Sequence, residues 1–155
     1  MNAIRRWLVV GGGAALVVVA GGVAQADGWA ELPPLDGELC ADRAEAAVAA
    51  GFNLIVGTDL PDVLNGGGGR DVIIGLAGND LIDGGGGNDL ILSGDGDDVV
   101  RGNVGDDTLC LGEGDDFGYG NPNDDRIFGE PGFDHGDGGL GVDGCAADVE
   151  VQISC

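Results

Sequence analysis

Carboxylates that recur every nine residues are the groups in this chain best placed to do chemistry. From residue 57 to residue 146 the sequence divides into ten consecutive nonamers without insertion or deletion. This window of 90 residues contains 18 aspartates, so a column drawn at random would hold about two, yet the sixth column holds aspartate alone. Carboxylate oxygens are the ligands that hard cations prefer, so the column predicts a row of cation sites. Its members are Asp62, Asp71, Asp80, Asp89, Asp98, Asp107, Asp116, Asp125, Asp134 and Asp143.

Glycines accompany the aspartates in the same frame. Positions one and four are glycine in eight of the ten repeats each. Glycine permits positive φ, so both positions predict a tight turn that exposes backbone carbonyl oxygens. A carboxylate beside such carbonyls forms the all-oxygen ligand set of calcium.

The residues after each aspartate predict the element that positions it. Positions seven to nine are typical of a short strand, and we expect the eighth side chain to point inward. One strand per nonamer makes half a coil, so repeats an even number apart should stack as parallel strands about 4.8 Å apart. The inward residues are Leu64, Ile73, Ile82, Ile91, Val100 and Leu109.

The pattern G-G-x-G-x-D-x-U-x, with U a large aliphatic residue, resembles the hemolysin-type or RTX calcium-binding repeats. Residues 66–74 and 84–92 match it almost fully, and the resemblance covers 90 of 155 residues. It implies an all-β, right-handed parallel β-roll (a β-solenoid) that binds several Ca²⁺ ions as cofactors. Each ion would lie between the position-six carboxylates of repeats n and n+2 and the carbonyls of their glycine-rich turns, which allows at most eight sites.

The resemblance assigns candidate metal ligands residue by residue. Each aspartate is paired with the one 18 residues further on, as in Asp71 with Asp89. The pattern weakens late in the chain, where glycines at 118 and 136 replace inward aliphatics, and occupancy beyond Asp125 stays open. We expect Ile127, Phe128 and Phe133 to support that end. The candidate ligands are Asp62, Asp71, Asp80, Asp89, Asp98, Asp107, Asp116, Asp125, Gly66, Gly68, Gly84 and Gly86.

The N-terminus is typical of an export signal. Arg5 and Arg6 precede an apolar run that ends in the cleavage pattern Ala24-Gln25-Ala26. We expect residues 1–26 to be a signal peptide and the protein to be extracellular, secreted or associated with the cell surface. A retained membrane anchor is the alternative.

Two further segments flank the repeats. Residues 27–56 are interpreted as a linker and N-terminal cap, in which a helix over 37–50 could cap the roll and Asn53 to Val56 form an incomplete repeat. Residues 57–146 hold the ten repeats, and the alternating residues of 147–155 predict a C-terminal cap strand.

Composition limits the partners. Acidic residues outnumber basic ones 28 to 6 for a net charge of -22, which argues against nucleic acid as a partner and against membrane insertion, and favours calcium ions. High charge with 5% aromatics is also typical of disorder, so we expect the chain to fold when calcium neutralises the turns. A disordered acidic polymer is the rival interpretation, and any cell-surface or extracellular partner stays unidentified.

Four cysteines, at positions 40, 110, 145 and 155, suit an oxidising compartment. Two disulfides allow three connectivities, and closeness in sequence favours Cys145 with Cys155, which leaves Cys40 with Cys110. A thiolate metal site is the alternative, although no C-x-x-C spacing occurs.

The sequence predicts no enzyme. The only histidine is His135, expected on an outward position, and the serines after the signal are Ser93 and Ser154, which gives no hydrolase triad. The alternatives to a calcium-binding protein are a non-catalytic cell-surface or adhesive scaffold and the remnant tail of an RTX-type secreted hydrolase.

Overall fold

The computed structural model describes residues 38–155. The predicted signal peptide and the first part of the predicted linker lie outside the described residues. Within residues 38–155, no helix has the length and apolar character that crossing a membrane requires.

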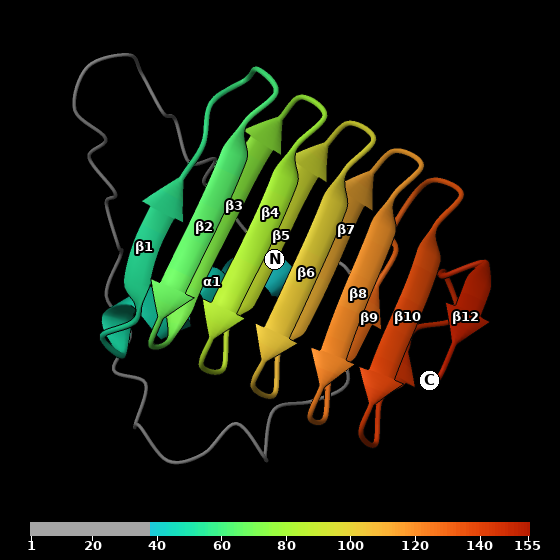
Figure 1. Ribbon diagram of the computed structural model, residues 1–155. Coiled ribbons are helices and arrows are strands. Elements are labelled where there is room, and N and C mark those ends of the chain that lie inside the picture. Colours follow the sequence, from blue (N-terminus) through green and yellow to red (C-terminus); the bar gives the residue numbers. More distant parts are fainter. Residues whose placement is uncertain (1–37) are drawn as a thin grey trace, which may run out of the picture.

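The chain coils into a parallel β-solenoid with two facing six-stranded sheets, which confirms the predicted β-roll (Figure 1). Successive strands alternate between the sheets, and partners within a sheet lie 18 residues apart, as Ile73 and Ile91 do. Sheet A comprises β1 (Asn53–Val56), β3 (Asp71–Ala77), β5 (Leu90–Asp95), β7 (Thr108–Glu113), β9 (Arg126–Phe128) and β11 (Gly144–Cys145). Sheet B comprises β2 (Val63–Gly68), β4 (Leu81–Gly86), β6 (Val99–Val104), β8 (Phe117–Pro122), β10 (His135–Leu140) and β12 (Val151–Ile153).

The space between the sheets holds the eighth-position side chains, as predicted. Five of them are fully buried there, and Leu64 at the first coil is partly buried. This continuous apolar column explains why the glycine-rich turns stay stacked, since burial of each large aliphatic side chain contributes about 1.5–3 kcal/mol. The fully buried members are Ile73, Ile82, Ile91, Val100 and Leu109.

The late repeats keep the core filled in a way that the repeat pattern does not predict. A Cβ added to Gly118 would lie 3.1 Å from Ile127 and 3.2 Å from Leu111, so Leu111, at a first position, fills the space that Gly118 leaves. Val149 lies 3.0 Å from the Cβ position of Gly136 in the same way. Ile127 joins this core as expected, but Phe133 is 59% exposed, so its predicted support of the late repeats is wrong.

The strands are longer than the three residues predicted. Most run from position seven to position three of the next repeat, because the turn backbones also pair with the neighbouring coil, as Gly67 does with Gly85. Positive φ occurs at position four, as expected, in repeats two to eight. Position one does not have it, and position two has it throughout repeats two to ten. The position-two residues are Gly67, Leu76, Gly85, Gly94, Asn103, Gly112, Asn121, Glu130 and Gly139.

Leu76→Gly is expected to stabilise the fold. Leu76 has φ 84°, a conformation that costs a residue with a Cβ about 1–2 kcal/mol, whereas glycine loses about 0.5–1 kcal/mol through its freer unfolded chain. Urea denaturation should therefore show a net gain of about 0.5–1 kcal/mol. Val104→Gly, at an exposed third position without positive φ, is the control and should lower stability. A loss of stability in Leu76→Gly would contradict this assignment.

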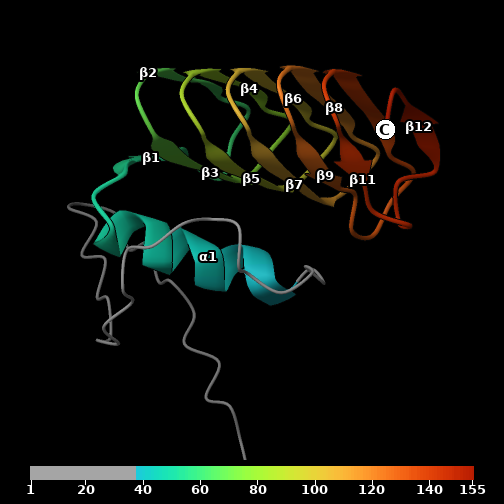
Figure 2. The same ribbon diagram turned by 90° about the horizontal axis from the view of Figure 1, so that it is seen from below.

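The predicted N-terminal helix is present as α1 (Glu38–Ala49), and it lies along the outer face of sheet A (Figure 2). Its apolar side packs on outward residues of sheet A, since Ala44 and Ala47 share a buried cluster with Val72 and Leu90. The helix ends at Ala49, and the φ of 94° at Gly51 lets the N–H of Phe52 donate to the Ala47 carbonyl at 3.2 Å. The helix packs there because outward-facing residues of sheet A such as Val72 and Leu90 are apolar, and α1 shields them from water.

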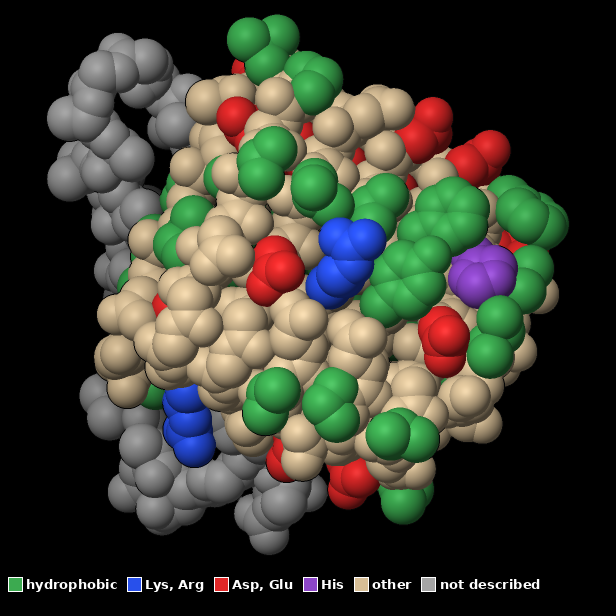
Figure 3. Space-filling view, in the orientation of Figure 1, with side chains coloured by type: hydrophobic (Ala, Val, Ile, Leu, Met, Phe, Trp, Pro, Cys, Tyr) green, Lys and Arg blue, Asp and Glu red, His purple; other side chains and the backbone are tan. Residues whose placement is uncertain are grey.

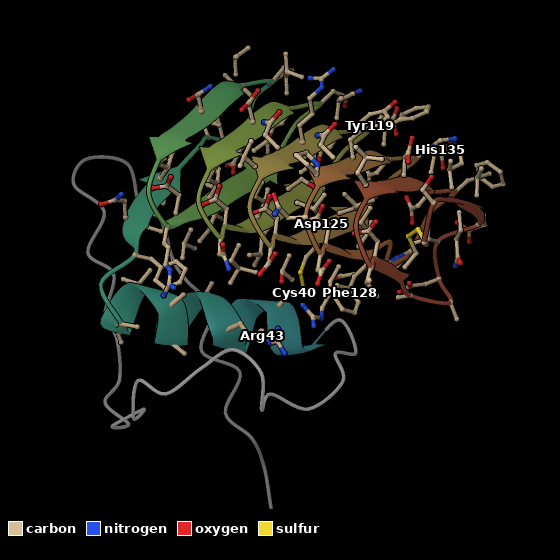
Figure 4. The ribbon with its side chains drawn as sticks, turned by 60° about the horizontal axis from the view of Figure 1, so that its bottom comes forward. Cys40, Arg43, Tyr119, Asp125, Phe128 and His135 are labelled. Carbon is tan, nitrogen blue, oxygen red and sulfur yellow. A yellow bond between two sulfur atoms is a disulfide. The ribbon has the colours of Figure 1, made fainter. Side chains whose placement is uncertain are left out.

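Both predicted disulfides are present. Cys40 and Cys110 join α1 to β7, with Cα atoms 6.5 Å apart, and Cys145 and Cys155 join β11 to the C-terminus, with Cα atoms 5.5 Å apart. Figure 4 shows Cys40 on the side of α1 that faces the strands, near Phe128.

The outer face of sheet B has no such cover among the described residues. Hydrophobic side chains lie there beside Arg, Asp and the single histidine (Figure 3). Arg101 lies 5.8 Å over the ring of Tyr119, and the rings of Phe117 and His135 are 5.4 Å apart. His135 is half-buried against Phe117, so it is less exposed than expected.

Candidate metal centre

The position-six aspartates form two ladders, one along each edge of the solenoid. Each carboxylate Oδ1 accepts a hydrogen bond from the backbone N–H of the position-six aspartate two repeats earlier, as Asp89 does from Asp71 at 2.9 Å. The same bond recurs through the chain with lengths between 2.7 and 3.1 Å. The eight pairs are Asp62 with Asp80, Asp71 with Asp89, Asp80 with Asp98, Asp89 with Asp107, Asp98 with Asp116, Asp107 with Asp125, Asp116 with Asp134 and Asp125 with Asp143.

The second oxygen of these carboxylates is buried without a partner in the described part of the chain. This holds for nine of the ten aspartates in the column, of which Asp71, Asp107 and Asp116 are 0% exposed. A buried carboxylate oxygen with no donor costs free energy that a proton or a cation could offset. The nine residues are Asp71, Asp80, Asp89, Asp98, Asp107, Asp116, Asp125, Asp134 and Asp143.

Around several position-one glycines, a carbonyl oxygen from the next coil lies together with the Oδ2 atom of the position-six aspartate. A Cβ added to Gly84 would lie 2.8 Å from Asp89 Oδ2 and 2.8 Å from the carbonyl oxygen of Gly102. The same two kinds of atom surround the Cβ position of Gly57, with Asp62 Oδ2 at 2.9 Å. Glycine therefore predominates at position one, because a side chain there would fill the space beside the carboxylate and the carbonyl.

This arrangement fits calcium. Within residues 38–155, three or more Asp, Glu, His or Cys side chains nowhere converge as a metal-binding group, so a cation here needs backbone carbonyls as well as carboxylates. Calcium takes six to eight oxygen ligands and accepts such mixtures. The unpaired Oδ2 atoms would supply the anionic oxygens, and the position-one carbonyls would supply the neutral ones.

The buried aspartates of the two ladders are more stable when a proton or a cation neutralises their negative charge. Burial raises the pKa of Asp89, Asp116 and Asp125 from 3.8 to about 7, against the lowering effect of the backbone hydrogen bond that each accepts. Burial likewise raises the pKa of Asp98 and Asp107 to about 6. Two carboxylates about 5 Å apart repel each other by about 3 kcal/mol at an effective dielectric constant of 20. The calcium-free ladders are therefore least stable when fully ionised.

The calcium-free protein is expected to lose stability as the pH rises. The aspartates bind protons more tightly in the folded chain, with pKa values near 6 to 7 against an ordinary 3.8, so the unfolded state binds fewer protons between these values. The free energy of unfolding should therefore fall from about pH 4 to pH 7, and calcium affinity should rise over the same interval. Circular dichroism and calcium titration at pH 5, 6.5 and 8 check both trends. Stability in chelator that rises with pH would contradict the prediction.

Of the four glycines predicted as metal ligands, the two at position one lie beside carboxylate oxygens and the two at position three do not. A Cβ on Gly66 would lie 2.8 Å from Asp71 Oδ2 and would collide with the carbonyl of Gly84. Gly68 and Gly86, at position three, have nothing within 4 Å of their Cβ positions, and the Gly86 carbonyl accepts a hydrogen bond from the N–H of Gly69 at 2.7 Å.

The first predicted aspartate also differs from the rest. Asp62 is only partly buried, and its Oδ2 accepts hydrogen bonds from the Thr58 N–H at 2.6 Å and the Thr58 hydroxyl at 2.9 Å. The remaining seven predicted aspartates, Asp71, Asp80, Asp89, Asp98, Asp107, Asp116 and Asp125, are buried and carry unpaired Oδ2 atoms.

Sequence reasoning missed a second set of carboxylates at position five. Asp97 Oδ1 accepts a hydrogen bond from the N–H of Asp115 at 3.1 Å, and Asp106 Oδ1 accepts one from Asp124 at 3.2 Å. These side chains are exposed on the outside of the turns, and their bonds run in the opposite direction along the chain. The Asp-Asp pairs of repeats five to eight were the available signal.

The comparisons with known proteins agree with this geometry. The family model of the RTX calcium-binding nonapeptide repeat (4 copies) matches residues 56–91, 83–118 and 112–144, which together span more than half of the chain. No curated protein and no solved structure gives a significant match. The chain belongs to the family of proteins with RTX calcium-binding nonapeptide repeats.

Proposed function

We propose that this chain is a secreted, non-catalytic protein whose repeat region folds around several calcium ions. The observation that carries the proposal is the row of nine buried aspartate oxygens without hydrogen-bond partners among the described residues, each on the inside of a turn. A folded chain that keeps such oxygens needs a counter-charge, and calcium suits both the carboxylates and the nearby carbonyls.

The charge of the chain supports this role. At a net charge of -22 the calcium-free chain repels itself, and each bound ion removes two negative charges while it stabilises only the folded state. Calcium modules outside cells bind with dissociation constants of about 10⁻⁴–10⁻³ M, so ordinary extracellular calcium would keep the sites filled. The protein would thus fold after export and stay unfolded where calcium is scarce.

Secretion is the second part of the proposal, and it is supported by the apolar N-terminal run with its small-residue ending. The two disulfides suit an oxidising compartment. Expression of the full chain, followed by N-terminal sequencing of the protein in the medium, should give Asp27 as the first residue. Retention of the whole chain in the membrane fraction would favour the anchored alternative.

The test of folding is a calcium titration of the purified protein, followed by circular dichroism and small-angle scattering, with magnesium as the control. We expect strand signal and compaction with calcium but not with magnesium, because magnesium gives up its waters reluctantly and demands octahedral geometry. Full strand content in excess chelator at neutral pH would show that folding does not need the ion.

A further inference from the structure

The C-terminal segment closes the solenoid with a shortened turn. Glu150 Oε2 accepts a hydrogen bond from the backbone N–H of Asp134 at 2.7 Å, which is the bond that a position-six aspartate makes in the other coils. The N–H of Val151 donates to the Asp134 carbonyl at 3.0 Å, as that of Leu81 does to Asp62 at 2.9 Å. Glu150 therefore takes the place of the next position-six aspartate, although β12 follows β10 after 16 residues and not 18.

Asp148 takes the place of a position-one residue in this turn. A Cβ on Gly129 would lie 2.8 Å from the carbonyl oxygen of Asp148 and would collide with Asp134 Oδ2. These are the two kinds of atom found around Gly84, namely the carbonyl of the following coil and the carboxylate of the same repeat. The carboxylate of Asp148 holds the turn, since it accepts hydrogen bonds from the N–H groups of Gly129 at 3.4 Å and Glu130 at 3.2 Å.

The side chain of Asp134 gives separate evidence that a cation binds at this turn. Its side chain is 0% exposed, and its Oδ1 accepts a hydrogen bond from the Asp116 N–H at 3.1 Å. Its Oδ2 is buried and has no partner within residues 38–155. This unpaired oxygen and the Asp148 carbonyl oxygen both lie beside the Cβ position of Gly129, and Asp148 is in the coil that also carries Glu150.

We propose that Asp134, Glu150 and the carbonyl of Asp148 form a terminal calcium site that fastens the last strand, β12, to the solenoid. The inference rests on the proposed calcium function but goes beyond the repeats, because Asp148 and Glu150 follow the residues that the family model matches. An ion there would hold β12 over β10, whose edge would otherwise be open to pairing with another chain.

Glu150→Gln tests the site. Glutamine keeps an acceptor for the Asp134 N–H but loses the charge, so the fold should persist while the terminal ion is lost. The full chain is expressed, the protein is purified, and bound calcium is counted by native mass spectrometry at saturating calcium. We expect one ion fewer than in wild type, together with amide exchange about tenfold faster over residues 147–155 and unchanged over residues 66–110.

Asp137→Asn is the matched control, because it removes one carboxylate from the outer face of the neighbouring strand β10 and should leave the number of ions unchanged. A wild-type number of ions in Glu150→Gln overturns the terminal site and leaves the repeat sites standing. A wild-type protein that binds no calcium overturns both the terminal site and the proposed function.

Discussion

Asp89→Asn is expected to stabilise the calcium-free protein at pH 8 and to destabilise the calcium-bound protein. Asparagine keeps an oxygen that can accept the hydrogen bond from the Asp71 N–H, so the backbone of the turn should be unchanged. In chelator the substitution removes a buried carboxylate whose pKa is raised to about 7, and the folded state no longer bears the cost of ionising it. In calcium it removes an anionic ligand, and the apparent affinity should fall by about tenfold or more.

In chelator, circular dichroism gives the pH at which strand signal is lost, and this pH should be higher in the variant than in wild type. In saturating calcium, urea denaturation should show a loss of stability. Asp95→Asn is the control, because Asp95 lies at the exposed third position of the following turn, and the substitution should change stability little under either condition. A variant that is destabilised equally in chelator and in calcium would show that Asp89 acts only as a structural acceptor. Such a result would remove the main physical argument for an ion inside the ladder.

Replacement of both Cys40 and Cys110 by serine is expected to cost about 4 kcal/mol in saturating calcium. The disulfide closes a loop with a sequence separation of 70, for which chain entropy predicts a stabilisation of that size. It also holds α1 against Val72 and Leu90, so the variant should expose the apolar outer face of sheet A. Urea denaturation gives the stability, and binding of a hydrophobic dye reports the exposed face.

The control for this variant is the double serine replacement of Cys145 and Cys155. That disulfide closes a loop with a separation of only 10, so its loss should cost about 3 kcal/mol without exposing the face under α1. A cost below about 1 kcal/mol for the Cys40 and Cys110 pair would show that α1 is held by packing alone.

The sequence predicted the architecture and the pairing of the aspartates because a solenoid repeats its geometry with its sequence. Once the period of nine and the two-repeat coil are recognised, Asp71 must lie beside Asp89 and Ile73 beside Ile91, and the structure pairs them so. The disulfides were predicted separately, because four cysteines allow only three connectivities and closeness in sequence favours Cys145 with Cys155.

Features that depend on packing between residues far apart in the sequence could not be predicted from the repeat pattern. Leu111 fills the core space beside Gly118 from position one, which is glycine in eight of the ten repeats, so the repeat pattern alone makes Leu111 look like a defect. Helix α1 covers a sheet face because outward residues such as Val72 are apolar, and the periodic pattern alone did not show which face needed cover. The role of Glu150 as a substitute for a position-six aspartate was not predicted, because the last turn is shorter and breaks the 18-residue spacing.

The turn conformation was predicted in part. Glycine at position four does have positive φ, as at Gly87, whereas Gly84 at position one is required by the close approach of Asp89 Oδ2 and the Gly102 carbonyl. Both demands produce glycine in the sequence, so composition cannot distinguish them. The distinction matters for function, because position one borders the Oδ2 atoms of the candidate metal ligands in most coils.

The central claim is that calcium lies inside the turns against the unpaired aspartate oxygens, and crystals grown in calcium test it most directly. An anomalous difference map should show peaks about 2.3–2.6 Å from the Oδ2 atoms of buried aspartates such as Asp89 and Asp107. Peaks found only at the exposed position-five carboxylates, or no peaks along either ladder, would contradict the account.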